Sequence, residues 1–391
     1  MRNRALVSLV AIALACSLGC RSQPVQQSGP ILGPPPVPTT AMEMATLSFL
    51  SYLGGKLEGS DSEVELRLHR CMKEALESQP LTAKKWSLVW GPAVFKFALA
   101  ELDDNMMFVV QDVTQPARYA VVVRGTNAAA ALDWLLEVFN VHDQLTWSEV
   151  LAATGGAAPA ATPPSDAKIA KGIYDGLAAL TTMVPDDGQG AGVTLQAFLA
   201  GLSQEHAGTP LRVEVAGHSL GGALAPVLGL WLADTQPAWN PSGDARLSVW
   251  AFAGPTPGNE AFAAYYQSRV GAVSNRIWNP LDVIPQAWEV STLEKVPDLY
   301  EPLTRADAVE RALLDGARDR VKDGGYAQPL PSATPLPAAL NSAYPTFTKQ
   351  LGWQHHCGYQ CALLINVPLT SHCPSDPELD CATADCPASL Q

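Results

Sequence analysis

Positive charge is scarce in this sequence. Its 391 residues include 25 Lys and Arg against 38 Asp and Glu, which gives a formal net charge of −13 at pH 7. The basic residues are not gathered into any one segment. Proteins that bind nucleic acids concentrate Lys and Arg on one face to contact phosphates, so we expect no nucleic-acid partner.

The sequence also lacks internal repeats and a long apolar segment. Ala5 to Leu18 is apolar but is short for a membrane span, and Arg2 and Arg4 precede it, as in a secretory signal. The run ends Ser17-Leu18-Gly19-Cys20, which resembles the lipobox of bacterial lipoproteins, although the usual Leu three positions before the Cys is absent. We predict a lipoprotein-type signal at 1–20 and membrane anchoring through lipidated Cys20. The alternative is an ordinary cleaved signal and a secreted or periplasmic protein, rather than an outer-membrane lipoprotein.

Composition divides the rest of the chain into three parts. Residues 21–40 are rich in Pro, Gln, Ser and Gly and have no apolar period, which predicts a flexible linker. Residues 41–370 predict one catalytic domain, and 371–391 a Cys-rich tail. Two stretches interrupt the regular pattern, 153–166 and 294–344, and we interpret both as surface insertions.

Six cysteines follow Cys16 and Cys20. An exported protein meets an oxidising compartment, and an even number of cysteines there favours disulfides, whose 15 alternative pairings stay open. The other interpretation is a zinc site made of Cys357, Cys361, His372 and Cys373, but their spacing is not that of a standard pair. We therefore expect no metal and no cofactor. The six are Cys71, Cys357, Cys361, Cys373, Cys381 and Cys386.

Strand-like and helical segments alternate through most of the chain. Helical patterns in 41–76 precede three short strands at 93–98, 106–110 and 119–123. Apolar strands at 213–216, 247–253 and 276–278 then alternate with helices at about 220–232 and 259–268. Such alternation predicts an α/β fold with a mostly parallel central sheet and helices on both faces.

The strongest chemical signal is Gly217-His218-Ser219-Leu220-Gly221. A serine hydroxyl is a weak nucleophile, and the Gly-x-Ser-x-Gly turn between a strand and a helix exposes it beside backbone N–H groups. An alternating strand pattern precedes this turn and a helical pattern follows it. The competing interpretation is a glycine-rich packing turn around a buried serine.

Several further motifs resemble the fungal-type or class 3 lipases, a branch of the α/β-hydrolases. The resemblance covers roughly 95–359, keeps the order of the family's motifs, and implies an α/β-hydrolase fold. Two positions depart from the family: Thr256 replaces an Arg, and Tyr359-Gln360-Cys361 replaces Glu-Tyr-Trp. The matching segments are GHSLGGALA at 217–225, VVRGT at 122–126, Asp133-Trp134, KGIY at 171–174, AFAGPTPGN at 251–259 and RIWNPLDVIP at 276–285.

The order of an α/β-hydrolase triad is Ser, acid, His. Asp282 follows a predicted strand between two prolines, so we predict it as the acid; a turn-capping role and Asp298 are the alternatives. His356 fits the family's His-x-Gly and is the predicted base, with His355 second and His372 third. His218, inside the elbow, is interpreted as structural.

Two further roles follow from the resemblance. The backbone N–H groups of Leu220 and Thr126 are the predicted oxyanion hole. Residues 127–147 occupy the position of a lid, and a helix with Trp134, Leu135 and Phe139 exposed would suit an oil interface. The alternative is that these side chains pack on the core.

We therefore expect a serine hydrolase that cleaves carboxylic esters through an acyl-enzyme, with an acylglycerol as substrate at a lipid interface. A phospholipase A1 or a feruloyl-type esterase would use the same triad, because the fold does not fix the substrate. A non-catalytic lipid-binding surface lipoprotein is the alternative from another class. The intact set of Ser219, Asp282 and His356 argues against it.

Overall fold

A computed structural model describes residues 39–95, 105–125, 139–155, 159–367, 373, 381 and 386–390. The predicted signal, Cys20 and nearly all of the predicted linker lie outside the described residues, as do Thr126, Trp134, Leu135 and His372. Within the described residues, no helix is long and apolar enough to cross a membrane. The boundary expected near 370 stays a prediction.

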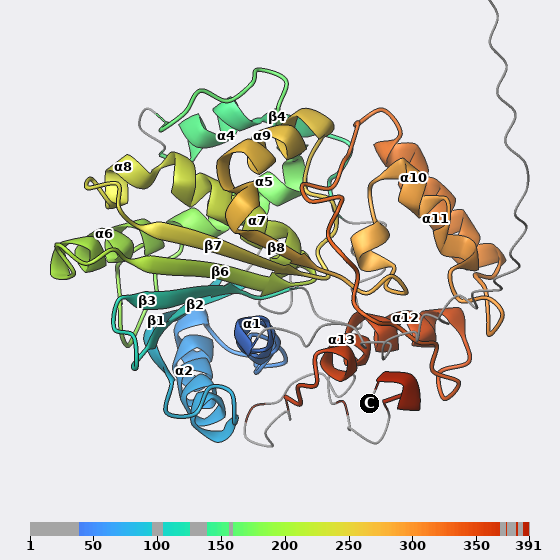
Figure 1. The fold of residues 1–391 in the computed structure, drawn as a ribbon, viewed down its shortest axis with the longest axis horizontal. Helices are drawn as coiled ribbons and strands as arrows, with labels where there is room; N and C mark the ends of the chain where they lie inside the picture. Colours follow the sequence, from blue (N-terminus) through green and yellow to red (C-terminus); the bar gives the residue numbers. More distant parts are fainter. Residues whose placement is uncertain are drawn as a thin grey trace, which may run out of the picture. The chain divides into compact units, whose positions relative to one another are not determined.

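A six-stranded sheet forms the centre, in the order β1-β2-β3-β6-β7-β8. The pairs β1/β2 and β2/β3 are antiparallel, and β3, β6, β7 and β8 run parallel. The predicted fold, an α/β-hydrolase with a mostly parallel sheet, is confirmed (Figure 1). The strands are β1 (Trp86–Phe95), β2 (Asn105–Asp112), β3 (Arg118–Val123), β6 (Arg212–His218), β7 (Arg246–Phe252) and β8 (Ser274–Ile277).

Helices cover both faces of the sheet because its strands carry apolar side chains on both sides. Alternate residues of β3 point into different cores: Val121 faces one cluster and Val122 the other. In Figure 1 the α7 layer lies above the sheet and α1 and α2 lie below it. The first layer holds α4 (Trp147–Ala153), α5 (Lys171–Thr182), α6 (Leu195–Glu205), α7 (Leu220–Asp234), α8 (Gln236–Trp239) and α9 (Glu260–Val270). The second holds α1 (Thr39–Leu50), α2 (Asp61–Ser78) and α13 (Cys357–Ala362).

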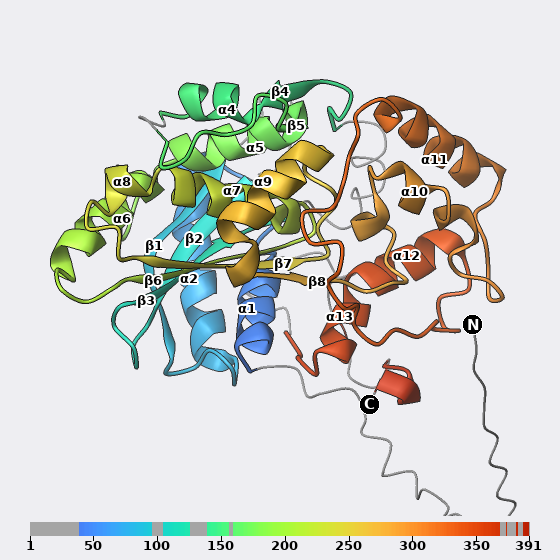
Figure 2. The ribbon, with the colours of Figure 1, turned by 45° about the horizontal axis from the view of Figure 1, so that its top comes forward.

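A third group of helices lies beyond the ends of β6 and β7 (Figure 2). It contains α10 (Val290–Leu293), α11 (Ala308–Val321) and α12 (Phe347–His355). Val283, Tyr300, Leu314 and Phe347 form a buried cluster of their own here. The segment 294–344, expected as a surface insertion, therefore supports α12, the helix that ends at His355. The short elements are β4 (Gln144–Thr146), β5 (Lys168–Ala170), η3 (Gly271–Val273), η4 (Ile284–Gln286), η5 (Val296–Asp298) and η8 (Ala388–Leu390).

All six cysteines beyond Cys20 form disulfides, as predicted. The pairs are Cys71–Cys373, Cys357–Cys381 and Cys361–Cys386. The first joins α2 to the tail, and the other two join α13 to the tail. The zinc alternative is wrong because its three cysteine sulfurs are consumed in these bonds, and the described residues contain no metal-binding cluster.

Candidate active site

Ser219 stands on a sharp turn between β6 and α7. Its φ of 61° and ψ of −126° are strained values for a non-glycine residue, as expected at a nucleophile elbow. A Cβ at Gly217 would lie 2.2 Å from Gly221 O, and one at Gly221 would lie 2.3 Å from Val123 O. Glycine at both positions therefore allows the backbone approach that the turn requires.

Three polar side chains form a continuous hydrogen-bonded chain at this turn. His355 Nε2 lies 2.8 Å from Ser219 Oγ, and His355 Nδ1 lies 2.8 Å from Asp282 Oδ2. All three residues are buried. A neutral imidazole that donates from Nδ1 to the carboxylate leaves Nε2 as an acceptor for the serine proton. This is the arrangement that activates a serine nucleophile.

The loop after β8 holds Asp282 in place. Asp282 Oδ1 accepts a hydrogen bond from Ile284 N at 3.0 Å, and Oδ2 accepts a second one from Tyr359 Oη at 3.0 Å. Tyr359 Oη in turn accepts from Asn279 N. Asp298, the alternative acid, instead pairs with Arg311 at 2.6 Å on the surface. The structure therefore places both Ser219 and Asp282 within hydrogen-bond distance of one histidine, His355.

His356, the predicted base, does not occupy the predicted position; His355 does. The prediction assumed a strand or tight loop, but α12 continues to His355, and neighbouring residues of a helix point about 100° apart. The His356 ring packs edge-on against Tyr52 with centroids 5.9 Å apart, and burial lowers its pKa well below the usual value. Gly358 makes room for Asn279, not for the His356 ring, since its Cβ would lie 2.8 Å from Asn279 Nδ2.

His218 connects the elbow to the base. Its Nδ1 lies 2.8 Å from Tyr52 Oη, and its Nε2 lies 2.8 Å from the backbone oxygen of His355. The structural role expected for His218 agrees with these contacts. Tyr52 and Tyr359 were not identified from the sequence; Tyr359 lies within the family's altered motif, which was the one available signal, and Tyr52 carried none.

The described residues at and beside the predicted oxyanion hole lie against Ser219. Leu220 is the first residue of α7, and N–H groups in the first turn of a helix have no partner within that helix. A Cβ at Gly125 would lie 2.5 Å from His218 O and 2.9 Å from Ser219 Cβ. The chain that leads into Thr126 therefore passes beside Ser219, while Thr126 itself lies outside the described residues.

Only the last part of the expected lid segment, 139–147, is described. Phe139 is buried there and stacks on Trp288, with ring centroids 4.8 Å apart and planes 6° apart. Trp147 is also buried and donates its indole N–H to Asp234 at 2.9 Å. The expectation that Phe139 is exposed is wrong, because Gly172 leaves the space that its ring fills.

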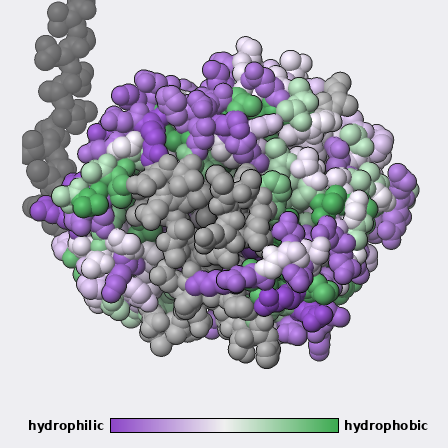
Figure 3. Space-filling model, turned by 180° about the vertical axis from the view of Figure 1, so that it is seen from behind, coloured by the Kyte–Doolittle hydropathy of each residue, from purple (hydrophilic) through white to green (hydrophobic). Residues whose placement is uncertain are grey.

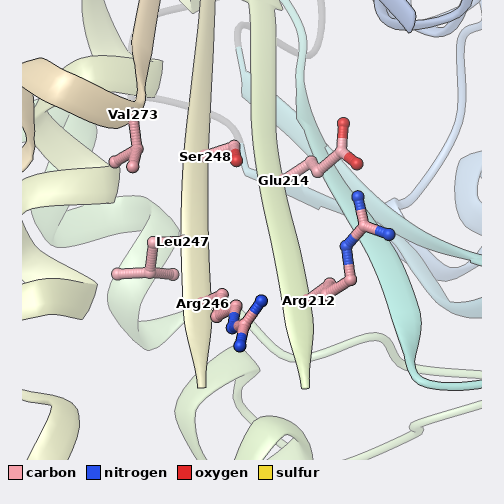
Figure 4. Close-up of a pocket in the computed structure, with 6 residues that line it drawn as sticks. All are labelled: Arg212, Glu214, Arg246, Leu247, Ser248 and Val273. Carbon is pink, nitrogen blue, oxygen red and sulfur yellow. The ribbon is translucent and has the colours of Figure 1, made fainter. Parts of the chain in front are cut away.

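A cavity lies at the other end of the sheet, with a volume of about 450 Å³. Figure 4 shows its lining side chains around the first residues of β6 and β7: Arg212, Glu214, Arg246, Leu247, Ser248 and Val273. Arg212 precedes Ser219 by the full length of β6, which corresponds to roughly 20 Å. This cavity therefore does not belong to the candidate active site.

The described surface is mainly hydrophilic on the face shown in Figure 3, with small apolar spots. The exposed large apolar side chains come from separate elements: Leu66, Val113, Val273, Val309 and Leu364. Single apolar residues of this kind are normal on soluble surfaces. The described residues therefore do not delimit a lipid-binding face.

Comparison with known proteins matches both the fold and the motifs. The family model "Lipase (class 3)" matches residues 120–291. The crystal structure of M37 lipase is 30% identical, covers 83% of this chain and 92% of its own, and superposes with a TM-score of 0.74. The chain belongs to the class 3 lipase family. The resemblance seen in the sequence is thereby confirmed.

Two curated lipases match over a shorter stretch. The lipases of Rhizopus niveus and Rhizopus oryzae are each 38% identical over 74 residues, or 19% of this chain. The match spans 18% of the length of these curated relatives. The short match supports the family and leaves the whole protein's substrate to be established by experiment.

Proposed function

We propose that this protein hydrolyses carboxylic esters through an acyl-enzyme, with Ser219 as nucleophile, His355 as base and Asp282 as the acid that orients it. The observation that carries the proposal is the unbroken hydrogen-bonded chain from Ser219 Oγ through the His355 ring to Asp282 Oδ2. A catalytically idle lipid-binding protein has no need of such a chain, which makes that alternative the weaker one.

The geometry supports the following sequence of steps. Ser219 Oγ attacks the ester carbonyl carbon while its proton moves to His355 Nε2, and Asp282 stabilises the imidazolium. The negative oxygen of the tetrahedral intermediate accepts hydrogen bonds from the backbone N–H groups of Leu220 and Thr126. The intermediate collapses, and His355 gives the proton to the leaving alcohol. Water then attacks the acyl carbon while its proton moves to His355, and His355 returns a proton to Ser219 Oγ as the carboxylic acid leaves.

We propose an acylglycerol as the substrate class, on the basis of the M37 and Rhizopus lipases to which the chain is similar. A panel of triglyceride, phospholipid, feruloyl ester and short-chain ester tests this assignment against phospholipase A1 and feruloyl-type esterase. A fluorophosphonate probe should label the parent protein but not Ser219→Ala, because only an activated serine reacts. A parent protein that resists labelling and cleaves no ester in the panel would contradict the proposal.

We further propose that the protein is exported, since three disulfides suit an oxidising compartment. Anchoring through lipidated Cys20 remains part of this proposal. Incorporation of labelled palmitate into the parent protein, and its loss in Cys20→Ser, is the expected result; equal incorporation, or none in either, would exclude the lipoprotein-type signal.

A further inference from the structure

The Tyr52 hydroxyl contacts the nucleophile turn at several points. It lies 2.8 Å from His218 Nδ1 and 3.3 Å from His218 O. A Cβ at Gly125 would lie 2.3 Å from the same oxygen, so the glycine leaves the space that the hydroxyl fills. The fold thus places in the active site a buried phenol that the proposed steps do not use.

The hydrogen bonds of His218 fix its protonation. The His355 carbonyl can only accept, so His218 Nε2, at 2.8 Å, carries a proton. Burial, followed by the charges of His355 and His356, lowers the pKa of His218 well below its usual value, which keeps the ring neutral. Nδ1 of a neutral ring is then an acceptor, and the Tyr52 O–H donates to it.

Arg124 holds the segment that carries Tyr52. This buried arginine belongs to the Val-Val-Arg-Gly-Thr motif after β3, and its guanidinium donates to the carbonyls of Ser51 and Leu53, the latter at 2.7 Å. It therefore binds the residues on both sides of Tyr52. Arg124 is thereby linked, through Tyr52 and His218, to the backbone carbonyl of His355.

The carbonyl that His218 binds lies at the end of α12. His355 is the last residue of that helix, where carbonyl groups have no partner within the helix. Asp282 orients the imidazole ring through Nδ1, but it does not restrain the main chain that carries the ring. A hydrogen bond to the His355 carbonyl supplies this second restraint.

We propose that Tyr52 and His218 are positioning residues that hold the main chain of His355, so that its Nε2 stays within hydrogen-bond distance of Ser219. The inference rests on the proposed function, because it concerns the same triad. If Tyr52 instead only satisfies a buried polar atom, its loss changes stability and leaves the chemical step unaltered.

Tyr52→Phe, with Tyr266→Phe as matched control, tests the proposal in the full chain. Tyr266 is also a buried phenol with a hydrogen bond, to Ser274 Oγ at 2.6 Å, but it lies on α9. We expect Tyr52→Phe to lower kcat about tenfold with KM within about twofold, since only the alignment of the base is changed. Tyr266→Phe should leave both constants unchanged. Equal kcat in the two variants, or a higher KM with normal kcat in Tyr52→Phe, would overturn the proposal.

A readout that does not need activity separates this test from the test of the proposed function. In protein with ¹⁵N-labelled histidine, the His218 Nδ1 resonance should move to higher frequency in Tyr52→Phe, because the nitrogen no longer accepts a hydrogen bond, and should stay unmoved in Tyr266→Phe. An unmoved resonance in both would overturn the proposal even if the parent cleaves no ester. Inactivity of the parent together with the shift would contradict the proposed function alone.

Arg124→Lys provides a second variant should Tyr52→Phe fold poorly. Lysine keeps the charge but cannot bind two carbonyls with a planar fork, so the Tyr52 segment loses one anchor. We expect a loss of kcat of several-fold with KM unchanged, and the same direction of shift at His218 Nδ1. A normal kcat and an unmoved resonance would show that the hydrogen bonds from Arg124 to the Tyr52 segment do not affect the position of His355.

Discussion

The two ends of β6 carry buried polar groups of opposite kinds. At the first end, Arg118 lies 2.7 Å from Glu214, 2.9 Å from Asp112 and 3.4 Å from Glu43, and Lys85 also pairs with Glu43. Burial would lower the pKa of Arg118, but the hydrogen bonds and charges of its carboxylate partners outweigh burial and raise it. This end consists of full charges, in which two cations pair with three carboxylates.

At the other end the buried groups are mostly neutral. Burial raises the pKa of Tyr52 and Tyr359 and lowers that of His218 and His356, so each of the four keeps its uncharged form. Asp282 is the carboxylate among them. Fixed ion pairs hold strands together, whereas a neutral network beside one carboxylate suits the proton transfer that we propose for His355. The difference between the ends is therefore one between holding structure and transferring a proton.

The largest loss of activity should follow substitution at the end of β6 that carries the proposed triad. Ser219→Ala and His355→Ala should each lower kcat/KM on a soluble short-chain ester by roughly 10⁴-fold or more, and the double variant should lose little further, because nucleophile and base act as a unit. His356→Ala should keep most of its activity, since the ring at hydrogen-bond distance from Ser219 Oγ is that of His355. An essential His356 beside a dispensable His355 would contradict the geometry of α12.

Breaking the charged end should affect stability instead. Arg118→Met leaves three carboxylates buried without their shared cation, which should cost roughly 3–5 kcal/mol in the free energy of unfolding. kcat at a temperature where the variant stays folded should remain close to that of the parent. Denaturant titration measures the first quantity, with exposed Arg212→Gln as control, expected within about 0.5 kcal/mol of the parent. A loss of activity without a loss of stability would show that the two ends are not separable.

The neutral network also makes a prediction about pH. His218 and His356 have lowered pKa values in the fold and ordinary values of about 6.5 when unfolded, so the unfolded chain binds protons that the folded chain does not. Stability from this source is complete above pH 6.5 and falls as the pH is lowered below it, by up to about 1.4 kcal/mol per pH unit for each histidine.

Unfolding midpoints from pH 8 to pH 5 measure this dependence. Below about pH 6.5, His356→Leu should reduce the number of protons taken up on unfolding by about one, and the stability should then fall less steeply with pH. Substitution of an exposed histidine, His142→Gln, should leave this dependence unchanged. The same slope in all three proteins would show that protonation of His356 is not what destabilises the fold in acid.

The sequence could predict those candidate site residues that a local motif or the order of residues along the chain determines. Ser219 could be predicted as the nucleophile because its elbow needs glycines at fixed offsets, and Asp282 as the acid because the acid must follow the nucleophile at the end of a strand. The histidine that lies beside Ser219 is one residue before the predicted base, because the pattern at 353–356 does not distinguish a helix from a strand, and the two conformations point His355 and His356 differently.

Contacts between distant segments could not be read from the sequence. Tyr52 reaches His218 across 166 residues, and nothing around Tyr52 signals chemistry. The segment 294–344 was expected on the surface because it interrupts the alternation of strands and helices, yet it contributes to the buried cluster beside α12. Pairing of the six cysteines depended in the same way on how α13 packs.

A smaller effect than that of Ser219→Ala should come from removing the hydrogen bond that Tyr359 donates to Asp282. Tyr359 lies on α13, which two disulfides fasten to the tail, and its hydroxyl bridges Asn279 N and Asp282 Oδ2. Tyr359→Phe keeps the ring but removes the donor, so Asp282 retains its bond to His355 and loses one of its other supports. A hydrogen bond to a charged group contributes about 1.5–3 kcal/mol, and part of that should be recovered by the remaining donors, so we expect kcat to fall about tenfold. Tyr266→Phe is again the control.

Reduction of the disulfides tests the same contact, because two of them hold α13, the helix that carries Tyr359. Reduction under native conditions should lower kcat of the parent. It should change kcat of Tyr359→Phe less, since the hydrogen bond that reduction would weaken is already absent in that variant. Equal sensitivity of both proteins to reduction would place the action of the disulfides elsewhere in the fold.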